Sequence, residues 1–398
     1  MNILIVTDAY PPMRTSGACH IYDLGQAFVK LGSRVNIIVP DSAQEQDVFI
    51  HVEDGVKVIR VKALHTKDVG YLQRTIAEFL NPFLIWRRLK QNPQFLQEKI
   101  DGVVWYSPTI FWGPLIARLK KHYQAKSYLI LRDIFPDWAL DLGVIKKGPA
   151  YRFLKAIEKY QYRQATLIGV QSPNNQSYFA ARYPQLKERT EVLWNWGQPN
   201  SVQKPCPVNL SVSSLAGRTL CIYAGNMGVA QGMDGLLDIA NSLKNRQDLG
   251  FVLVGRGSEV GRLAMRILDE KLENVLLLNE MDGDEIAGLY AQCQIGIVML
   301  DARHTTHNIP GKWISYLNAG LPAFALVNPN NDMIELISSN QLGFATSSNQ
   351  LAVRIEGLLS LQNKLRSDLA ISNRCQLLGS DLFSSQKAAS QISHHFSH

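Results

Sequence analysis

The chain has 398 residues, 46% of them apolar, and a net charge of +7. This length and composition suffice for two globular domains and argue against wholesale disorder. Five cysteines stand at positions 19, 206, 221, 293 and 375, and no two form a CxxC pair. The pattern speaks against a disulfide framework, structural zinc and thioredoxin chemistry, and it favours a reducing compartment. We find no signal peptide and no run of about 18 apolar residues, so we expect a cytoplasmic protein without a transmembrane helix.

The positive charge is concentrated in the first half of the chain. Residues 1–195 hold 26 Lys and Arg against 17 Asp and Glu, whereas residues 196–398 hold 15 against 17. A basic half suits anionic lipid, a pyrophosphate-linked acceptor or nucleic acid. A generally solvated basic face explains the same count equally well.

The first half alternates short β-rich runs with amphipathic helical stretches. We predict strands at 3–7, 34–39, 56–61, 102–105, 127–131, 167–170 and 192–193, and helices at 18–31, 72–89, 109–122 and 151–164. Strand, helix and strand joined by short connections form the βαβ unit of a parallel sheet.

The second half repeats this layout after a proline-rich break at 197–217, which we interpret as a linker. Strands are predicted at 219–224, 251–254, 275–278, 295–300 and 323–327, and helices at 232–243, 258–270, 284–291 and 311–319. The expected fold is α/β, with two Rossmann-like, doubly wound parallel-sheet domains at 1–196 and 218–380 that face each other across a cleft. A last helix, within 381–398, is expected to return to the first domain. Ligands of such sheets bind beyond the carboxyl ends of the strands.

A glycine-rich loop follows the first strand of the second half. Gly225, Asn226, Gln231 and Gly232 belong to it, and a helix is predicted directly afterwards. Glycines let a ligand approach the backbone, and a helix start directs N–H groups at an anion, so the loop suits a diphosphate. It matches neither the G-x-G-x-x-G nor the Walker pattern, and a purely structural turn is equally compatible with it.

Two further loops of this half carry cations. Arg256 lies between two glycines after the strand at 251–254, and Lys312 lies in the first turn of the helix predicted at 311–319. A cation at a helix start opposes the helix dipole and therefore favours an anion nearby. Solvated surface side chains are the alternative.

These motifs together resemble the family 4 retaining glycosyltransferases, which have the GT-B fold, and in particular WbuB-like enzymes of surface-polysaccharide synthesis. The matching stretches are 225–232, 254–257, 309–322 and the opening 5–17. The resemblance implies transfer of a hexose or N-acetylhexosamine from a UDP-sugar to a lipid-linked or saccharide acceptor. It implies no cofactor besides the UDP-sugar co-substrate, no metal, no nucleic acid, and a peripheral position on an anionic membrane surface at the inner face of the cell membrane.

The resemblance also assigns residues to the donor site. They are Gly17, Gly225, Asn226, Gln231, Gly232, Arg256, Met281, His307, Asn308, Ile309, Pro310 and Ser315. Two positions that hold Glu in typical members are His307 and Ser315 here, and Asn226 and Gln231 stand where many members place Arg and Lys. Because these charges are missing, we expect Lys312 to stabilise the leaving diphosphate as the catalytic cation.

The acceptor site is expected in the first domain. Asp133 directly follows the strand at 127–131, where it would orient or deprotonate the acceptor hydroxyl, unless it caps the next helix. Arg14, Trp112 and Trp138 are the expected acceptor contacts, although most Trp side chains are simply core residues.

Two segments allow more than one interpretation. Asp282 and Asp284 form an Asp-x-Asp triplet that resembles a metal motif, but we interpret them as capping residues of the helix that begins there. The segment 71–96 combines aromatic and basic residues, as a membrane-surface helix does, and a helix packed within the domain is equally compatible.

Two rival functions remain open. A UDP-sugar 2-epimerase has the same two-domain architecture, but it needs carboxylates for proton abstraction, and the missing Glu pair counts against it. A non-catalytic nucleotide-sugar binding protein is compatible with the lost charges. Turnover of a UDP-sugar with and without acceptor separates the three functions.

Overall fold

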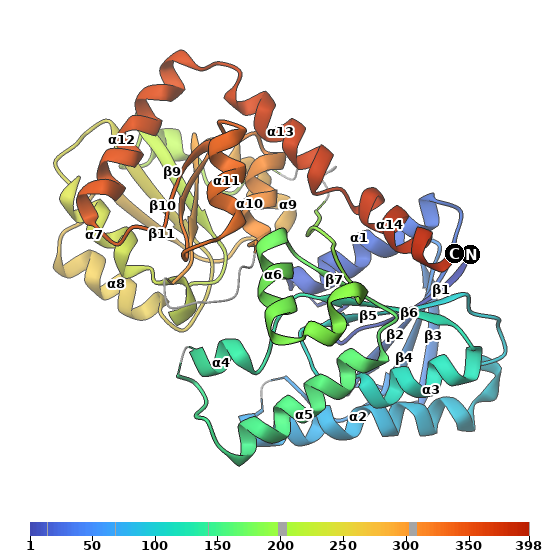
Figure 1. Ribbon diagram of the computed structural model, residues 1–398. Helices are drawn as coiled ribbons and strands as arrows, with labels where there is room; N and C mark the ends of the chain where they lie inside the picture. The colour runs from blue at the N-terminus through green and yellow to red at the C-terminus, as the bar shows by residue number, and fades with distance from the viewer. Residues whose placement is uncertain (14, 68, 142, 198–204, 302–308, 398) are drawn as a thin grey trace. The chain divides into compact units, whose positions relative to one another are not determined.

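The computed structural model describes residues 1–13, 15–67, 69–141, 143–197, 205–301 and 309–397. The chain divides into two compact units. Unit 1 comprises Met1–Trp196 together with Ser385–His398, and unit 2 comprises Gly197–Ser384. Each unit is a layered α/β structure with its own sheet (Figure 1).

Unit 1 is built on an eight-stranded sheet in the order β3-β4-β2-β1-β5-β6-β7-β8. Neighbouring strands are parallel except β3 and β4, which pair antiparallel at one edge. The strands are β1 (Asn2–Val6), β2 (Arg34–Asp41), β3 (Val48–Glu53), β4 (Val56–Lys62), β5 (Gly102–Ser107), β6 (Lys126–Leu131), β7 (Leu167–Val170) and β8 (Thr190–Val192).

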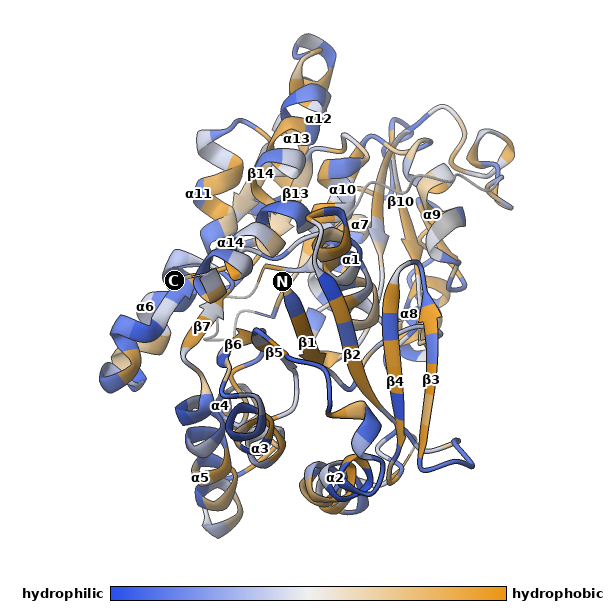
Figure 2. Ribbon diagram, turned by 90° about the vertical axis from the view of Figure 1, so that its right-hand side faces the viewer, coloured by the Kyte–Doolittle hydropathy of each residue, from blue (hydrophilic) through white to orange (hydrophobic). Residues whose placement is uncertain are grey.

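Helices cover both faces of this sheet. They are α1 (Ser16–Lys30), α2 (Tyr71–Gln91), α3 (Gly113–Tyr123), α4 (Asp137–Asp141), α5 (Pro149–Gln164), α6 (Pro173–Arg182) and α14 (Ser385–Ser397), with short 3₁₀ turns η1 (Pro93–Phe95) and η2 (Pro184–Arg189). Side chains alternate along β1: Ile3 and Ile5 share a core with α1 and α14, whereas Leu4 and Val6 share the other core with α2 and α3. This alternation, typical of a strand buried on both faces, accounts for the continuous apolar run of β1 (Figure 2).

Unit 2 has a six-stranded, fully parallel sheet in the order β11-β10-β9-β12-β13-β14. Its strands are β9 (Thr219–Ala224), β10 (Leu249–Val254), β11 (Val275–Leu278), β12 (Ile295–Met299), β13 (Ala323–Leu326) and β14 (Gly343–Thr346). Its helices are α7 (Asp234–Ser242), α8 (Val260–Asp269), α9 (Gly283–Tyr290), α10 (Gly311–Asn318), α11 (Asp332–Ser339), α12 (Leu351–Ser367) and α13 (Ile371–Leu382), with 3₁₀ turns η3 (Leu210–Val212) and η4 (Val229–Gln231).

Three features of the fold differ from the sequence-based expectation. Strands β3 and β14 were not predicted; each is the edge strand of its sheet, where burial is partial and the apolar pattern is weak. The end of the predicted linker packs on unit 2, because Leu210 and Leu215 are buried and the Leu210 N–H donates to Gln292 Oε1 at 2.8 Å. The helix predicted at 232–243 is α7, which begins at Asp234; the 3₁₀ turn η4, which was not predicted, precedes it, and Gly232 with φ +59° separates the two. None of the helices in the described ranges has the length and apolarity needed to cross a bilayer.

Candidate functional site

The glycine-rich loop of unit 2 lies where the strand order reverses, beyond the carboxyl end of β9. Strand β9 is flanked by β10 on one side and by β12 on the other, so neighbouring connections diverge at this point, which is where doubly wound sheets generally bind their ligands. The backbones of two loops touch here: Met227 N–H donates to Arg256 O at 2.7 Å, and Gly225 N–H donates to Val254 O at 2.9 Å. A Cβ on Gly257 would lie 2.2 Å from Met227 O, and the residue has φ +152°, so only glycine fits.

Two amide side chains fix the shape of this loop. Gln231 Oε1 accepts hydrogen bonds from Gly228 N at 3.0 Å and from Asn226 Nδ2 at 3.1 Å. Tyr223 OH donates to Asn226 O at 2.5 Å. Asn226 and Gln231 occupy the positions where many family 4 members have Arg and Lys. Their neutral side chains are hydrogen-bonded to each other, and Gln231 is also bonded to the loop backbone.

Lys312 supplies the positive charge beside this loop. Its Nζ is buried, lies 3.6 Å from the centre of the Tyr223 ring, and would be 3.6 Å from a Cβ on Gly225. Within the described part of the chain this nitrogen has no hydrogen-bond acceptor. Burial lowers the pKa of Lys312 to about 7. A desolvated ammonium at the start of α10, opposed by the helix dipole, is suited to an anionic ligand.

The other predicted donor-site residues lie in unit 2, except Gly17, which lies on α1 of unit 1. Arg256 is exposed and lies 3.3 Å from Glu280 Oε1, Met281 is half-buried before α9, and Ser315 is exposed on α10. Ile309 is buried and Pro310 is the N-cap of α10. Arg14, His307 and Asn308 lie outside the described residues. The donor-binding assignments stay predictions.

Asp282 is the N-cap of α9, and its N–H donates to Glu285 Oε2 at 3.3 Å. This is the position that the capping interpretation gave it; the Asp284 side chain is outside the described part. Among the residues that the structure describes, no three His, Cys, Asp or Glu side chains gather in a way that would hold a metal ion.

In unit 1, two acidic side chains lie at the carboxyl ends of the central strands of the sheet, the position that corresponds to the glycine-rich loop of unit 2. Strands β1, β5 and β6 are adjacent and parallel, so Asp8, Tyr106 and Asp133 come to the same edge. Burial raises the pKa of Asp133 to about 6; the charge of Arg132 opposes this shift and that of Asp8 adds to it. Burial also raises the pKa of Asp8, with Lys67 Nζ 3.7 Å from Asp8 Oδ2 as a partial counter-charge. An acidic hydrogen-bonding edge of this kind suits a hydroxyl group.

Arg132, the buried cation next to Asp133, donates its hydrogen bonds to backbone carbonyls after β8. Arg132 Nη1 donates to Leu193 O at 2.9 Å, and its guanidinium lies 4.8 Å from the Trp196 ring centre. Burial lowers the pKa of Arg132 to about 10. Arg132 is thus a structural cation with backbone acceptors, whereas Lys312 Nζ has no hydrogen-bond acceptor among the described residues.

His20 also lies at the carboxyl ends of these strands, next to Tyr106. His20 Nδ1 is 3.4 Å from Tyr106 OH, and Trp196 Nε1 donates to His20 O at 2.8 Å. Burial, aided by the charge of Arg132, lowers the pKa of His20 to about 3, so the ring is neutral at physiological pH. Gly17 lets α1 approach closely, since a Cβ there would be 3.2 Å from the Tyr106 ring.

The two predicted acceptor tryptophans occupy different environments. Trp112 is 3% exposed and belongs to the core beneath α3, whereas Trp138 is half-buried with its ring 6.0 Å from that of Phe135. Their roles in acceptor binding stay predictions. Sequence reasoning did not identify Asp8, His20 or Tyr223. Asp8 was within reach, because it follows the first strand just as Asp133 follows the strand at 127–131.

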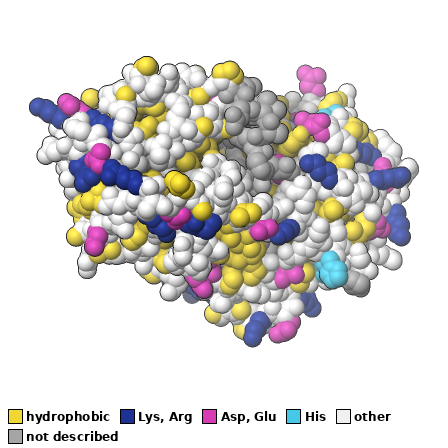
Figure 3. Space-filling model, turned by 90° about the horizontal axis from the view of Figure 1, so that it is seen from above, with side chains coloured by type: hydrophobic (Ala, Val, Ile, Leu, Met, Phe, Trp, Pro, Cys, Tyr) yellow, Lys and Arg dark blue, Asp and Glu magenta, His cyan; other side chains and the backbone are white. Residues whose placement is uncertain are grey.

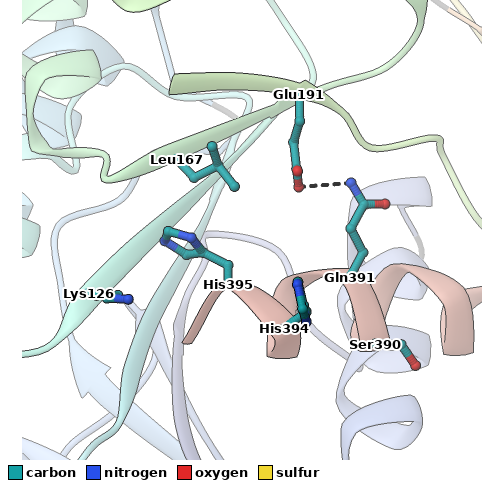
Figure 4. A pocket seen from close by; sticks show the side chains of 7 residues that line it. All are labelled: Lys126, Leu167, Glu191, Ser390, Gln391, His394 and His395. Carbon is teal, nitrogen blue, oxygen red and sulfur yellow. Dashed lines mark hydrogen bonds between the residues drawn. The ribbon is translucent and has the colours of Figure 1, made fainter. Parts of the chain in front are cut away.

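A cavity of about 580 Å³ lies at the opposite ends of the unit 1 strands, where β6 and β7 begin (Figure 4). Lys126 and Leu167, which begin β6 and β7, line it together with Glu191 and the face of α14. Gln391 Nε2 donates to Glu191 Oε1 at 2.8 Å and to Val192 O at 2.9 Å. These bonds attach α14 to the sheet, and the cavity is remote from the carboxyl ends of the strands.

Comparison with known sequences finds distant relatives, and no family model matches the chain. WbjE of Pseudomonas aeruginosa, named as a probable glycosyltransferase, is 20% identical over 224 residues, which cover 55% of this chain and 55% of that protein. WcaI of Escherichia coli K12, named as a colanic acid biosynthesis glycosyl transferase, is 22% identical over 246 residues, covering 60% of this chain and 58% of that protein. The matched part thus spans little more than half the length of these relatives.

Comparison with solved structures defines the fold. Sucrose-phosphate synthase of Thermosynechococcus elongatus is similar with a TM-score of 0.72 and 13% identity, covering 100% of this chain and 98% of that one. Anabaena HepE, solved with UDP-glucose, gives 0.69 and 16%, covering 100% and 99%. WaaG, a glycosyltransferase of lipopolysaccharide biosynthesis, gives 0.69 and 13%, covering 98% and 99%. The chain has the GT-B fold, and the expected fold class of two α/β domains with doubly wound parallel sheets is confirmed.

Proposed function

We propose that this protein is a retaining glycosyltransferase of family 4. It moves a hexose or N-acetylhexosamine from a UDP-sugar to a lipid-linked or saccharide acceptor in the synthesis of a cell-surface polysaccharide. Two distant relatives named as glycosyltransferases, and a structural neighbour solved with UDP-glucose, support the proposal.

The observation that carries the proposal is the environment of Lys312. A buried ammonium beside a glycine-rich loop, at the crevice of a doubly wound sheet, is suited to the diphosphate of a nucleotide sugar. In the reaction the bond between the anomeric carbon and the diphosphate oxygen breaks, and negative charge grows on that oxygen. A diphosphate raises the pKa of Lys312, so that its protonated form stabilises the charge where it develops.

Asp133 is proposed to act on the acceptor. Its carboxylate accepts a hydrogen bond from the acceptor hydroxyl, which orients the oxygen that forms the new glycosidic bond. The proton of this hydroxyl passes to Asp133 or to the leaving diphosphate. With a pKa near 6, Asp133 is ionised at neutral pH and basic enough to share the proton.

We further propose that the UDP-sugar is the only small-molecule requirement, with Lys312 supplying the charge that a metal ion supplies in metal-dependent transferases. The reaction is assigned to the cytoplasmic face of the membrane. All five cysteines belong to the described residues and are unpaired, which fits a reducing compartment.

The test uses the purified full chain with radiolabelled UDP-glucose and UDP-N-acetylglucosamine, each with and without a bacterial lipid extract as acceptor. The expected result is labelled lipid and released UDP, both dependent on the extract and unchanged by EDTA. The anomeric configuration of the product reports retention. A changed sugar without acceptor would point to an epimerase, and tight binding without turnover to a binding protein. Loss of activity with EDTA and its recovery with manganese would contradict the charge role of Lys312.

A further inference from the structure

Lys312 differs from the surface lysines of the protein in how its charge is stabilised. On the face drawn in Figure 3, Lys and Arg side chains (dark blue) lie at the surface, and several of them lie beside Asp or Glu. Lys312 Nζ is buried instead, and among the residues that the structure describes it has no hydrogen-bond acceptor. A buried ammonium loses its hydration, so the groups around it decide how much of it is charged before a ligand binds.

The face of the Tyr223 ring is one of these groups. Lys312 Nζ lies over this ring, 3.6 Å from its centre. The faces of an aromatic ring carry negative charge density, and they attract an ammonium most strongly where water is excluded. Tyr223 is fully buried, so the contact meets this condition. The ring therefore favours the charged form of Lys312.

The position of Tyr223 is fixed by the sheet and by the glycine-rich loop. Tyr223 lies on β9 opposite Leu253 of β10, and its side chain belongs to the unit 2 core. Its OH donates to Asn226 O at 2.5 Å, which connects the end of the strand to the loop. This residue thus contacts the cation through its ring and the loop through its hydroxyl.

Helix α10 holds Lys312 over this ring through a contact one turn further along. Tyr316 lies four residues after Lys312, so both side chains are on the same side of α10. Ala224 N–H donates to Tyr316 OH at 2.9 Å, which attaches the helix to β9 at the residue next to Tyr223. Gly296 of β12 leaves room for Tyr316, because a Cβ there would be 2.5 Å from the Tyr316 ring. Strand and helix together therefore set the distance between the ammonium and the ring.

We propose that Tyr223 is a positioning residue whose ring holds the Lys312 ammonium in its charged form beside the glycine-rich loop. An anion at this loop would then meet a cation that is already charged and in place, which is what preorganisation of a charge requires. The Tyr223 hydroxyl makes a separate contribution, because it bonds to the loop and not to the cation. The inference rests on the proposed function, in which Lys312 stabilises the leaving diphosphate.

NMR titration of the Lys312 side chain in the full chain tests this role without any ligand. Lysine is isotope-labelled at Cε, and the Lys312 signal is identified by its loss in Lys312→Arg. Tyr223→Leu removes the ring and should move the titration midpoint of Lys312 down by about one pH unit or more, because the charged form loses its attraction to the ring. Tyr223→Phe keeps the ring and should leave the midpoint where it is. Phe251→Leu is the matched control, at a fully buried aromatic residue of the same core, and should also leave it unchanged.

The other ionisable groups near this contact do not explain such a shift. Tyr223 and Tyr316 stay neutral throughout the titration, since burial raises the pKa of both. Asp301 borders the loop at Gly232 and is the same in every variant. If Tyr223→Leu does not melt cooperatively, Tyr223→Met removes the ring and fills more of its space.

Binding of UDP-glucose connects the contact to the candidate site. Its affinity for Tyr223→Leu should be about tenfold lower than for the unaltered chain at pH 8 and nearly unchanged at pH 5.5, where Lys312 is largely protonated in both proteins. Tyr223→Phe should follow the unaltered chain at both pH values. A loop that is merely distorted would lose affinity equally at both, and that result would make Tyr223 a structural residue.

The two measurements separate this inference from the proposed function. A midpoint that moves in Tyr223→Leu alone, in a protein without transferase activity, would keep the role of Tyr223 and reject the enzyme. An unmoved midpoint in a folded Tyr223→Leu variant would overturn the role of Tyr223, even where sugar transfer by the unaltered chain is confirmed. An equal shift in Phe251→Leu would assign the effect to a loosened core and would likewise overturn it.

Discussion

The two units build similar sheets and place opposite charges at the carboxyl ends of their strands. In unit 2 the charged group is Lys312, an ammonium with no hydrogen-bond acceptor among the described residues. In unit 1 the cation Arg132 is bonded to Leu193 O, and the groups with unusual proton affinity are the carboxyls of Asp8 and Asp133. The strand ends of unit 2 are thus suited to an anion, and those of unit 1 to a group that donates a hydrogen bond.

In the proposed transferase this difference would divide the reaction between the two units. A doubly wound sheet supplies the crevice, and the residues that follow its strands decide what enters it. The two burials have opposite effects on protonation: desolvation lowers the pKa of Lys312 and raises that of Asp133. The predictions below test whether these groups have separate roles.

The largest effect is expected for Lys312→Ala. Losing one preorganised charge that stabilises a leaving diphosphate should lower kcat by roughly 10² to 10³. Turnover of the radiolabelled UDP-sugar measures it, with Lys244→Ala as a control at an exposed lysine. Melting temperature should not fall, because the buried ammonium is itself poorly solvated. Activity within about twofold of the unaltered chain would remove Lys312 from the mechanism.

The second prediction concerns the backbone contact between the loop at 225–232 and the loop at 255–257 in unit 2. Gly257→Ala should lower the free energy of unfolding by roughly 1–3 kcal/mol, because the new Cβ meets Met227 O at 2.2 Å and φ is +152°. Gly261→Ala is the matched control on α8, where a Cβ meets nothing within 4 Å. That substitution should be neutral or stabilising by up to about 1 kcal/mol. Equal unfolding midpoints in urea for both variants would show that the loops do not require this close contact.

A smaller effect is expected in unit 1. Asp133→Asn should lower transfer at least tenfold while UDP affinity stays the same, because orientation of the acceptor is lost and the donor site is untouched. Glu188→Gln, at an exposed carboxylate of the same unit, is the control. In the unaltered chain, transfer should also fall as pH drops through about 6, where Asp133 becomes protonated, and this decline should vanish in the Asn variant. A parallel loss of UDP affinity would reassign Asp133 to the donor.

The sequence predicted the positions of the loops better than their chemistry. Strands β9 and β11 were predicted to the residue, because continuous apolar runs bounded by turns define buried parallel strands. The placement of Lys312 at a helix start was also readable. Its contact with the Tyr223 ring was not, since that contact joins residues 89 positions apart in a way no local pattern records.

The acidic edge of unit 1 shows the same limit. Asp133 was visible as a residue after a strand, but the rise of its pKa depends on burial and on Asp8, 125 positions away. The hydrogen bonds that hold Arg132 inside the unit come from the segment after β8, which local pattern does not connect to β6. The order of the strands in the sheet brings these side chains together, whereas the periodicity of the sequence predicts only the helices and strands themselves.

The smallest predicted effect is the pH dependence of donor binding, which tests Lys312 without mutation of the loop. The free protein holds Lys312 with a pKa of about 7, so the ammonium is largely protonated at pH 6.5 and mostly neutral at pH 8. A bound diphosphate favours the charged form, so binding takes up a proton above pH 7 and weakens as pH rises. Between pH 6.5 and 8 the affinity for UDP-glucose should fall about five- to tenfold. UDP-glucose is the suitable probe because its diphosphate has no ionisation in this range, whereas free UDP does. Calorimetry in two buffers of different ionisation enthalpy measures the proton uptake directly. The Lys312→Ala variant should bind more weakly with neither pH slope nor proton uptake, and a slope that survives in this variant would assign the titration to another group.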